Sequence, residues 1–481
     1  MSKKSEEGIT AKKNENFSEW FTQVVQKCEL ADLRYNIKGF LVFQPWSVLA
    51  MEKMYDYMEK NLQKKGHKPY WFPTLIPESN LKKESEHLSG FTPEVFWISS
   101  SGKDKLDEPL ALRPTSETAF YQMFSLWIRS YKDLPFKTYQ RANIFRYDTK
   151  ATRPFLRSRE FHWIETHCAH ESEKNALQQV KEDMKTTKEV MHDIFGVPFI
   201  FFERPQWDKF PGASRTFAAD ALNPDGKVIQ QPSTHMISQE FSKAFDVKFK
   251  DKDGKDKYSF MTCYGPAISR IFASVVITHG DDKGLKFPWE IAPIQTVIVP
   301  IDAKLNKKAE KIKKEIEKIV NVEIDYSDKR PGEKFNYWEM KGIPIRIDLG
   351  LQDSKKGKVT IFRRDLDKKI VVSEKSIVKE ISKISREFTK NLIKKADRVF
   401  DNRIKEVKDI KEMEKAIKEG LVAKCRFCST QADGIKCAEV IEKNIGAEVR
   451  GTRLDEKTKV SGKCAICDKK ASVIVYIAKS Y

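Results

Sequence analysis

Arginines, carboxylates and aromatic side chains crowd into residues 112–167 of this 481-residue chain, in a stretch too apolar for a solvated surface. The stretch holds Leu112-Arg-Pro-Thr-Ser-Glu117, then Arg141, Arg146 and Asp148, and then the run from Arg153-Pro-Phe-Leu-Arg157 to His167. The planar fork of arginine matches phosphate oxygens in a bidentate way. We therefore predict a pocket for a polyanion beside a small apolar ligand, as in a nucleotide-dependent active site.

Two strands are expected to position these side chains, because residues two apart on a strand share a face. The two predicted faces carry Gln140, Ala142, Ile144, Arg146 and Asp148, and Phe161, Trp163, Glu165 and His167. The loop 149–159 between the strands adds Arg153, Arg157 and Arg159. A buried charge must be paired or meet a ligand, since leaving it unsatisfied costs on the order of several kcal/mol. Spacing alone leaves one alternative open, a salt-bridged hairpin over a core.

The charge balance favours a polyanionic partner. The sequence has 88 Lys and Arg against 69 Asp and Glu, a formal net charge of +19 spread along the chain. This excess is typical of proteins that bind nucleic acid, although a lysine-rich proteome with solvated helix faces would give the same balance. No apolar run is long enough to span a membrane, and residues 1–16 lack the apolar segment of a signal peptide. We expect a cytoplasmic protein that does not enter a membrane.

Two C-x-x-C pairs near the C-terminus predict a metal site. They are Cys425 with Cys428 and Cys464 with Cys467, and Cys437 lies between them. In a reducing compartment such pairs form a tetrahedral thiolate zinc site more readily than two disulfides. A closed four-sulfur site is structural, because catalytic zinc keeps an open position for water. We predict structural zinc held by the four paired cysteines, with Cys437 left unassigned.

Composition shifts divide the chain into four parts. The predicted parts are a disordered basic tail (1–16), a catalytic domain (17–290), an α/β domain (291–395) and a zinc-binding domain (396–481). Within the α/β domain, the pattern predicts strands over 293–300, 322–326 and 344–349 and a helix over 303–320. A charged helical stretch is expected over 396–419.

Several motifs resemble those of prolyl-tRNA synthetases of the archaeal and eukaryotic type, which are class IIa aminoacyl-tRNA synthetases. They are Arg113-Pro-Thr-Ser-Glu-Thr118, Phe145-Arg-Tyr-Asp148, Arg153-Pro-Phe-Leu-Arg-Ser-Arg-Glu160 and the stretch from Asp328 to Arg346. The resemblance implies an α+β catalytic core with a mostly antiparallel sheet (the class II synthetase fold). An α/β anticodon-binding domain and a small zinc-containing α/β C-terminal domain would follow. The implied reaction is ATP-dependent ligation of L-proline to tRNA(Pro) through a prolyl-adenylate.

The resemblance assigns roles in catalysis and in ATP binding. Arg146 and Arg270 match the catalytic arginines. A cation fixed at Arg146 would stabilise the charge that develops as the proline carboxylate attacks the α-phosphate and pyrophosphate leaves. Magnesium would bridge the phosphates of ATP. The implied ATP contacts are Arg146, Asp148, Arg157, Ser158, Gln230, Ser233 and Arg270.

A second group of residues is implied for proline. The protonated amine offers two N–H donors and a charge, so the hydroxyl of Thr115 and the carboxylate of Glu117 would suit it. Capping of a helix that starts after Pro114 would explain the same two residues. Aromatic walls fit a flat apolar ring. The implied proline contacts are Thr115, Glu117, Arg146, Trp163, Glu165, His167, Phe210 and His235.

Proofreading and assembly can also be predicted. An apolar pocket discriminates one methylene by only about 1–3 kcal/mol, so alanine should be activated occasionally. Residues 170–265, between the motifs of Arg146 and Arg270, are needed for the strands of the core and leave no room for a domain-sized editing insertion. We predict no alanine editing in cis. The segment containing Pro73 and Pro77 resembles the family's interface strand, which implies a homodimer.

Glu339, Lys341 and Arg346 lie in or beside the strand that the resemblance assigns to reading anticodon bases. Carboxylates accept from the edge N–H groups of guanine, and arginine donates to its O6 and N7. Glu339 and Lys341 could instead form a surface pair. The final Ser480-Tyr481 resembles the family's C-terminal tail, whose tyrosine carboxylate approaches the active site.

Three other functions would share parts of this pattern. Another class IIa synthetase, such as the threonyl or glycyl enzyme, would keep the arginines and change the pocket for the amine of the amino acid. A threonyl enzyme would also need a Cys/His/His zinc site, and no such set is evident in residues 110–280. A synthetase-like RNA-binding or regulatory protein without catalysis would not need the arginines that bind phosphates. The presence of these arginines argues against such a protein. A zinc-dependent nucleic-acid hydrolase conflicts with the closed thiolate site.

Overall fold

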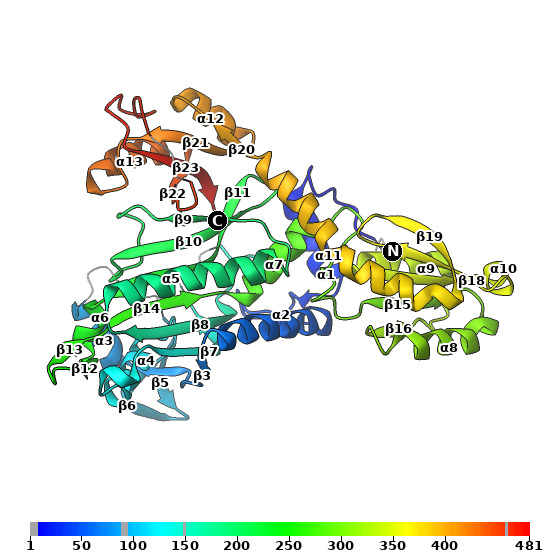
Figure 1. The fold of residues 1–481 in the computed structure, drawn as a ribbon, viewed down its shortest axis with the longest axis horizontal. Coiled ribbons are helices and arrows are strands. Elements are labelled where there is room, and N and C mark those ends of the chain that lie inside the picture. The colour runs from blue at the N-terminus through cyan, green and yellow to red at the C-terminus, as the bar shows by residue number, and fades with distance from the viewer. Residues whose placement is uncertain (1–7, 88–94, 148–150, 457–459) are drawn as a thin grey trace.

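The computed structural model describes residues 8–87, 95–147, 151–456 and 460–481, and its ribbon shows three connected bodies (Figure 1). A mixed sheet of eleven described strands runs through the largest body and continues into the third. In sheet order these are β20 (Ile404–Glu406), β21 (Val422–Phe427), β23 (Val473–Ser480), β22 (Glu448–Arg453), β9 (Ile200–Glu203), β10 (Arg215–Leu222), β11 (Lys227–Ser238), β14 (Phe260–Gly265), β8 (Glu160–His170), β7 (Phe136–Phe145) and β3 (Lys68–Pro69).

The two strands predicted to carry the site are present as β7 and β8, but β7 ends at Phe145, so Arg146 follows the strand and Asp148 lies outside the described residues. The two strands pair antiparallel from Phe136 opposite Ala169 to Phe145 opposite Glu160. Alternate residues Gln140, Ala142 and Ile144 are buried, as period-two alternation requires. Antiparallel pairing continues through β14, β11, β10 and β9, which gives the mostly antiparallel core that we expected.

Helices bury the apolar face of this sheet. The helix α7 (Ile268–His279) is buried at almost every residue and packs against α2 (Pro45–Lys64). The other helices of this body are α1 (Phe17–Lys27), α3 (Glu78–His87), α4 (Glu117–Trp127), α5 (Glu173–Thr187), α6 (Glu240–Ala244), the 3-10 helix η1 (Tyr131–Asp133) and the π-helix η2 (Lys188–His192).

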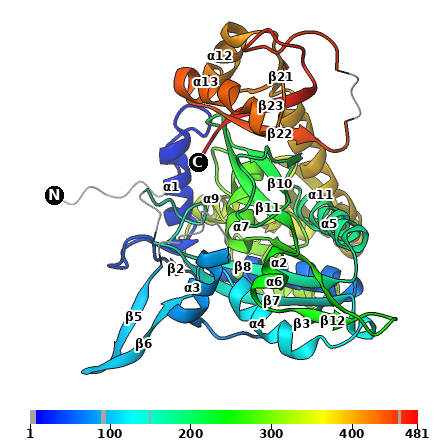
Figure 2. The ribbon, with the colours of Figure 1, turned by 90° about the vertical axis from the view of Figure 1, so that its left-hand side faces the viewer.

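Smaller sheets flank the body. They are β1 (Ala31–Asp32) with β2 (Val42–Phe43), β12 (Lys248–Lys250) with β13 (Asp256–Tyr258), and β4 (Leu75–Pro77) with β6 (Asp104–Leu112) and β5 (Trp97–Ser101). Figure 2 shows the hairpin of β5 and β6 projecting from the body.

The second body has a five-stranded sheet in the order β16 (Val322–Ile324), β15 (Thr296–Pro300), β17 (Ile345–Leu349), β18 (Lys358–Arg363) and β19 (Lys368–Ser373). Its helices are η3 (Ala303–Leu305), α8 (Asn306–Ile316), α9 (Pro331–Met340), α10 (Leu351–Lys355), η4 (Glu374–Ser376) and α11 (Ile377–Asp401). The three predicted strands are therefore present. The predicted helix over 303–320 is shorter, because a 3-10 turn precedes α8 and α8 ends at Ile316, which leaves Ile319 outside it and 44% exposed.

The third body contains β20 to β23, α12 (Ile410–Lys418), α13 (Ile435–Ile445) and η5 (Ala432–Gly434). The prediction of one charged helix over 396–419 is wrong. The long helix α11 reaches across from the second body and ends at Asp401, the strand β20 follows, and α12 starts at Ile410 (Figure 1). Pairing of β22 with β9 and of β23 with β11 joins this body to the central sheet.

Part of the predicted tail is ordered. Residues 1–7 lie outside the described residues, but residues 8–16 pack against the body. The Lys13 ammonium donates to the Gly280 carbonyl at 2.7 Å, and its backbone N–H donates to Asp282 at 2.8 Å. The apolar residues Ile9 and Ala11 contact the main core, which holds this stretch against the body although most of its side chains are exposed. In the parts of the chain that are described, no helix is both long and apolar enough to cross a membrane.

Candidate active site

One cavity of about 260 Å³ brings most of the predicted site residues together. It opens on one face of the central sheet, between β8, β11 and β14 and the start of α7. The predicted residues that line it are Thr115, Glu117, Arg146, Trp163, Glu165, His167, Phe210, Gln230, Ser233, His235 and Arg270. Segments separated by up to 155 positions therefore meet at one site.

A second cavity of about 310 Å³ shares Arg146, Gln230 and Arg270 with the first. It adds Arg157 and Ser158, which were predicted to contact ATP. The predicted contact Asp148 lies outside the described residues. The two cavities together form an elongated site with apolar walls at one end and guanidinium groups at the other.

The guanidinium groups lie close enough to repel one another. Burial, together with the charges of Arg146 and Arg157, lowers the pKa of Arg270 to about 10, so that Arg270 stays protonated at neutral pH. Arg270 is held by the carbonyls of Leu156 and Gln230, each at 3.1 Å, and Arg146 donates to the Pro114 carbonyl at 3.0 Å. Like charges held this way are stabilised by a polyanion between them.

The remaining arginines of the 112–167 stretch do not serve this site. Arg141 points away and pairs with Glu52 at 2.7 Å and Glu59 at 3.1 Å. The Arg159 guanidinium lies 4.2 Å from the ring of Tyr147. The expectation that the whole arginine cluster builds one pocket is therefore wrong. Arg141 faces away because successive residues on β7 lie on opposite sides of the sheet, and Arg159, just before β8, lies over Tyr147 instead.

A buried polar network lies at the apolar end. Glu165 accepts from Ser116 at 2.5 Å, from Gln140 at 2.6 Å and from His167 at 3.3 Å. Burial opposes ionisation of Glu165, but these hydrogen bonds outweigh it and lower the pKa of the carboxyl group. The network therefore fixes a carboxylate beside the cavity, where a cationic ligand would find a partner.

Thr115 and Glu117 adjoin this network. Both are buried, and the Thr115 hydroxyl donates to the Glu117 carboxylate. Glu117 is the first residue of α4, yet no side chain at its N-cap, Ser116, bonds to the helix backbone. Helix capping by Thr115 or Ser116 is thus not what the structure has, although Glu117 still lies in the first turn.

Aromatic rings wall the cavity. The rings of Phe210 and His235 lie 4.7 Å apart, and those of Phe161 and Trp163 lie 5.6 Å apart. Burial lowers the pKa of His235 to about 3, so this ring is neutral and acts as an apolar wall. The buried Trp163 Nε1 has no hydrogen-bond partner within the described residues, so it could donate to a ligand in the cavity.

Sequence reasoning missed several lining residues. Arg204, Asp208, Lys209, Thr216 and Cys263 also face the first cavity. Thr216 donates to or accepts from His235 at 3.1 Å. Cys263 reaches the cavity because its strand β14 lies beside β8 in the sheet, which is a pairing between distant segments that spacing cannot reveal.

The C-terminal body reaches the second cavity through Arg450, Ser480 and Tyr481. Asp220 on β10 pairs with Arg204 at 2.7 Å and with Arg450 at 2.7 Å, and all three side chains are buried. Tyr481 accepts from Arg153 at 3.3 Å. The end of the chain thus lies at the wall of the arginine-rich cavity.

Two of the three predicted anticodon residues lie together. Arg346 pairs with Glu339 at 2.9 Å and lies 4.1 Å from the ring of Phe335. Lys341 is buried and pairs instead with Glu29 at 2.7 Å, in the catalytic body. A surface pair of Glu339 with Lys341 is therefore wrong, and the buried ammonium of Lys341 is not placed to reach a base.

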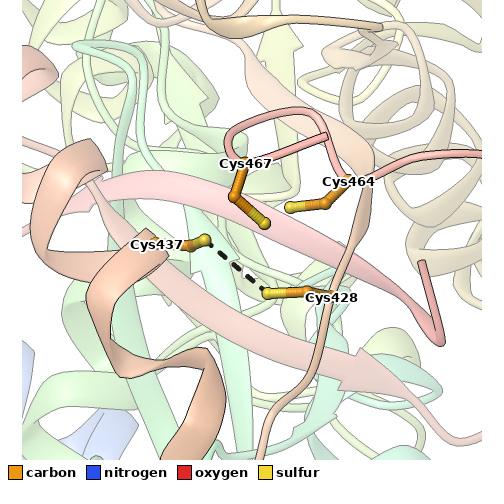
Figure 3. A group of neighbouring side chains, drawn as sticks. All are labelled: Cys428, Cys437, Cys464 and Cys467. Atoms are coloured by element: carbon orange, nitrogen blue, oxygen red, sulfur yellow. Dashed lines mark hydrogen bonds between the residues drawn. The ribbon is translucent and has the colours of Figure 1, made fainter. Parts of the chain in front are cut away.

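Four cysteines gather in the C-terminal body, but not the four that were predicted. Ligand atoms of Cys428, Cys437, Cys464 and Cys467 all lie within 4.8 Å of one another, and their sulfur atoms converge in Figure 3. Cys425 is not among them, because it lies inside β21, opposite Val475, with its side chain in an apolar core. Cys437 takes its place from α13.

This cluster fits zinc. The sulfurs of Cys428 and Cys437 are 3.6 Å apart, and none of the four cysteines is in a disulfide. Zinc–sulfur bonds of about 2.3 Å in a tetrahedron need sulfurs about 3.8 Å apart. Four thiolates leave no open position, so an ion bound here would be structural.

Three family models match the chain. Residues 96–279 match the tRNA synthetase class II core domain (G, H, P, S and T), residues 295–384 match the anticodon binding domain, and residues 410–481 match the prolyl-tRNA synthetase C-terminal domain. The proline–tRNA ligase of Thermofilum pendens is 46% identical over 486 aligned positions, which cover 99% of this chain and 100% of that protein.

Two solved structures are similar along their whole length. Prolyl-tRNA synthetase of Giardia lamblia, in complex with prolyl-adenylate, has a TM-score of 0.95 at 35% identity and covers 98% of this chain and 100% of that one. Prolyl-tRNA synthetase of Cryptosporidium parvum, complexed with halofuginone and AMPPNP, has a TM-score of 0.93 at 32% identity and covers 99% and 100%.

Proposed function

Since the chain belongs to the prolyl-tRNA synthetase family and has its class II core, we propose that it activates L-proline with ATP and transfers it to tRNA(Pro) in the two cavities described above. One observation carries the proposal. A hydroxyl, carboxylates and aromatic walls face the same space as Arg146 and Arg270. A ring-shaped amino acid and a triphosphate could therefore be bound side by side.

In the first step, a carboxylate oxygen of proline attacks the α-phosphorus of ATP, and the bond to pyrophosphate breaks. Arg146 and Arg270 stabilise the charge on the phosphoryl oxygens, and Arg157 holds the phosphates farther out. The protein needs no nucleophile of its own, because the substrate carboxylate supplies it. In the second step, a ribose hydroxyl of the tRNA attacks the adenylate carbonyl, and AMP leaves.

The amine of proline is held at the other end of the site. Thr115 accepts one N–H, and Glu117 with Glu165 offsets the charge. The Glu165 carboxylate is kept ionised by its hydrogen bonds, which supports this assignment. Trp163, His167, Phe210 and His235 enclose the pyrrolidine ring.

Magnesium enters as part of the MgATP substrate, and ATP also contacts Ser158, Gln230 and Ser233. Cys428, Cys437, Cys464 and Cys467 would hold a zinc ion, which would cross-link the segment after β21, the helix α13 and the turn at residues 464–467. This role is structural, so no chemical step depends on the ion.

Editing in cis is not part of the proposal. All of residues 170–265 are described, and they form α5, η2, β9 to β14 and α6, which belong to the core sheet and its cover. These elements leave no separate domain within this span, which supports the prediction. Rapid hydrolysis of Ala-tRNA(Pro) by the purified protein would contradict it.

The protein is proposed to act in the cytoplasm as a homodimer. Glu339 and Arg346 are proposed to contact guanines of the proline anticodon. The Glu339 side chain is 16% exposed, and the Arg346 side chain that pairs with it is 3% exposed. An entering guanine could therefore replace Arg346 as the partner of Glu339, or replace Glu339 as the partner of Arg346. Pairing of Arg346 with Glu339 and Asp348 satisfies its charge without RNA.

The proposed activity can be tested by ATP–pyrophosphate exchange with each of the twenty amino acids. Strong exchange with proline alone is expected, with only weak exchange for alanine. Exchange with a different amino acid would reassign the substrate, and no exchange with any amino acid would favour a non-catalytic RNA-binding protein.

A further inference from the structure

The loop 205–212, here called the Trp207 loop, touches both the proline pocket and the cysteine cluster. On one side, Asp208, Lys209 and Phe210 line the first cavity, and Phe210 packs on His235. On the other side, the indole of Trp207 packs against the apolar core of the C-terminal body, which includes Cys437 and Cys464. One short loop therefore spans the distance between the two sites.

Two of the contacts on the far side involve residues 429–436, which lie between two of the cysteines. The Gln206 backbone N–H donates to the Thr430 carbonyl at 3.0 Å. A Cβ atom on Gly434 would lie 3.3 Å from Cη2 of Trp207 and 1.9 Å from the Ser429 carbonyl oxygen. Only glycine allows the segment to turn this tightly beneath the indole.

The cysteines at both ends fix this segment. Cys428 lies just before it and Cys437 just after it, and their sulfurs are 3.6 Å apart. An ion bound by both would close a short loop and restrict its conformations, whereas without the ion only the apolar core and a 3-10 turn would hold it.

On the near side, hydrogen bonds and the Phe210 ring fix the loop to the pocket wall. The Phe210 N–H donates to the Thr216 hydroxyl at 2.8 Å, and the Ala213 N–H donates to the Phe210 carbonyl at 3.0 Å. Asp208 keeps 51% exposure of its side chain. Trp207 is the apolar contact that ties the other side of the loop to the C-terminal body.

We infer that residues 429–436 of the zinc-binding segment hold the Trp207 loop in its proline-binding conformation, with Trp207 as a positioning residue that raises the affinity for proline. The inference rests on the proposed function, which supplies both the proline pocket and the bound zinc. Trp207 does not touch the substrate. It acts by keeping Phe210 and its neighbours against the pocket.

The test compares full-length wild type, Trp207→Ala, Trp207→Phe and the control Val440→Ala, which alters an exposed residue on α13 away from the loop. Calorimetric titration measures proline binding, and exchange assays measure KM for proline and for ATP. If loss of the anchor leaves about one molecule in ten with an ordered loop, the Kd for proline rises about tenfold. We expect this tenfold rise in the Kd for proline in Trp207→Ala, with the KM for ATP and the zinc content unchanged. In Trp207→Phe the Kd for proline should return toward the wild-type value.

A second arm removes zinc by chelation from wild type and from Trp207→Ala. Because both changes release the same loop, chelation should weaken proline binding in wild type and add little in Trp207→Ala. The inference would be overturned if chelation and Trp207→Ala weakened proline binding by fully additive amounts. It would also be overturned if Trp207→Ala raised the KM for proline and the KM for ATP equally, or lowered the thermal midpoint with proline affinity unchanged. Proline-dependent exchange by wild type reports on the proposed function separately.

Discussion

At the scale of single residues, the site combines charges that need opposite partners. Arg146, Arg157 and Arg270 lie close enough for their charges to lower the pKa of Arg270, while Glu165 is held ionised at the other end. Such an arrangement is costly without a ligand, and it matches a substrate that is anionic at one end and cationic at the other.

Arg146 offers the most direct test of this arrangement. Replacing Arg146 with alanine removes a cation that faces the transferring phosphoryl group, so exchange should fall by about 10²–10³-fold or more. The proposed anticodon contacts, Glu339 and Arg346, lie in the second body, so tRNA binding in a filter assay should change little. Arg141→Ala is the matched control, because Arg141 lies on β7, the strand that ends just before Arg146, and pairs with Glu52 and Glu59 outside the cavity. Equal loss of exchange and tRNA binding in Arg146→Ala would mean that Arg146 is structural.

The cysteines give a second test at this scale. Cys437→Ser should release zinc and lower the thermal midpoint, because it removes one of four ligands, whereas Cys425→Ser should retain about one zinc per chain, since its side chain packs in the core. Metal content measured by atomic absorption distinguishes the two variants. Zinc lost from Cys425→Ser and kept in Cys437→Ser would restore the assignment based on C-x-x-C spacing.

At the scale of elements, period-two alternation predicted β7 and β8 and thereby most of the site. It succeeded because these strands alternate between one face with Gln140 and Ile144 and another with Arg141 and Asn143. Elements without a period were not predictable. The three-residue strand β20 lies within a uniform lysine and glutamate composition and gives no signal of its own.

The same limit explains the metal ligands. Cys437 on α13 lies nine residues after Cys428, which is not a characteristic spacing for a metal ligand. Cys425 fits the C-x-x-C pattern by sequence, but the strand β21 directs its side chain into the core. The lining residues Arg204 and Lys209 were missed for a related reason. They flank a loop without hydrophobic periodicity, and only the pairing of β9 and β10 brings it to the cavity.

The end of helix α7 predicts a pH dependence of stability. His279 is buried, and its Nε2 donates to the Phe195 carbonyl at 3.0 Å. Burial, together with Lys13 and Lys286 nearby, lowers the pKa of His279 to about 4. Because the unfolded chain binds this proton near pH 6.5, the stabilisation is present above that pH and is lost as the pH falls toward 4.

The expected loss from this one group between pH 7 and pH 5 is about 1–2 kcal/mol. In His279→Gln, which keeps a donor for the Phe195 carbonyl, the drop in thermal midpoint between pH 7 and pH 5 should shrink. An unchanged drop would show that other groups, such as the buried His67 and His170, dominate the acid sensitivity.

At the scale of the whole molecule, the three bodies are not independent. The strands β22 and β23 extend the catalytic sheet, the ion pairs of Asp220 join Arg204 to Arg450, and Lys341 ties the second body to Glu29. The site thus receives side chains from the first and third bodies, and its geometry depends on how they pack. This is why a substitution in the C-terminal body can alter binding in the catalytic one.

One apolar surface of the catalytic body has no partner within the described residues, and it predicts the homodimer. Tyr70 and Trp127 stack with their rings 5.4 Å apart, and β4 and β5 flank β6 beside them. The large apolar side chains exposed here are Trp71 at 89%, Leu126 at 55%, Trp97 at 48%, Leu75 at 39% and Trp127 at 38%. A surface this apolar is typical of an interface, and a stable one would bury at least about 1,000 Å².

We therefore expect wild type to sediment as a dimer at micromolar concentration, and Leu126→Asp and Trp71→Asp to sediment as monomers, because each places a charge in the apolar surface that the dimer would bury. Val371→Asp is the control, since Val371 is also exposed, at 59%, but lies on β19 of the second body. Its sedimentation coefficient should match that of wild type. A wild-type protein that stays monomeric at every concentration would contradict the dimer, and dissociation by Val371→Asp as well would place the interface on the second body instead.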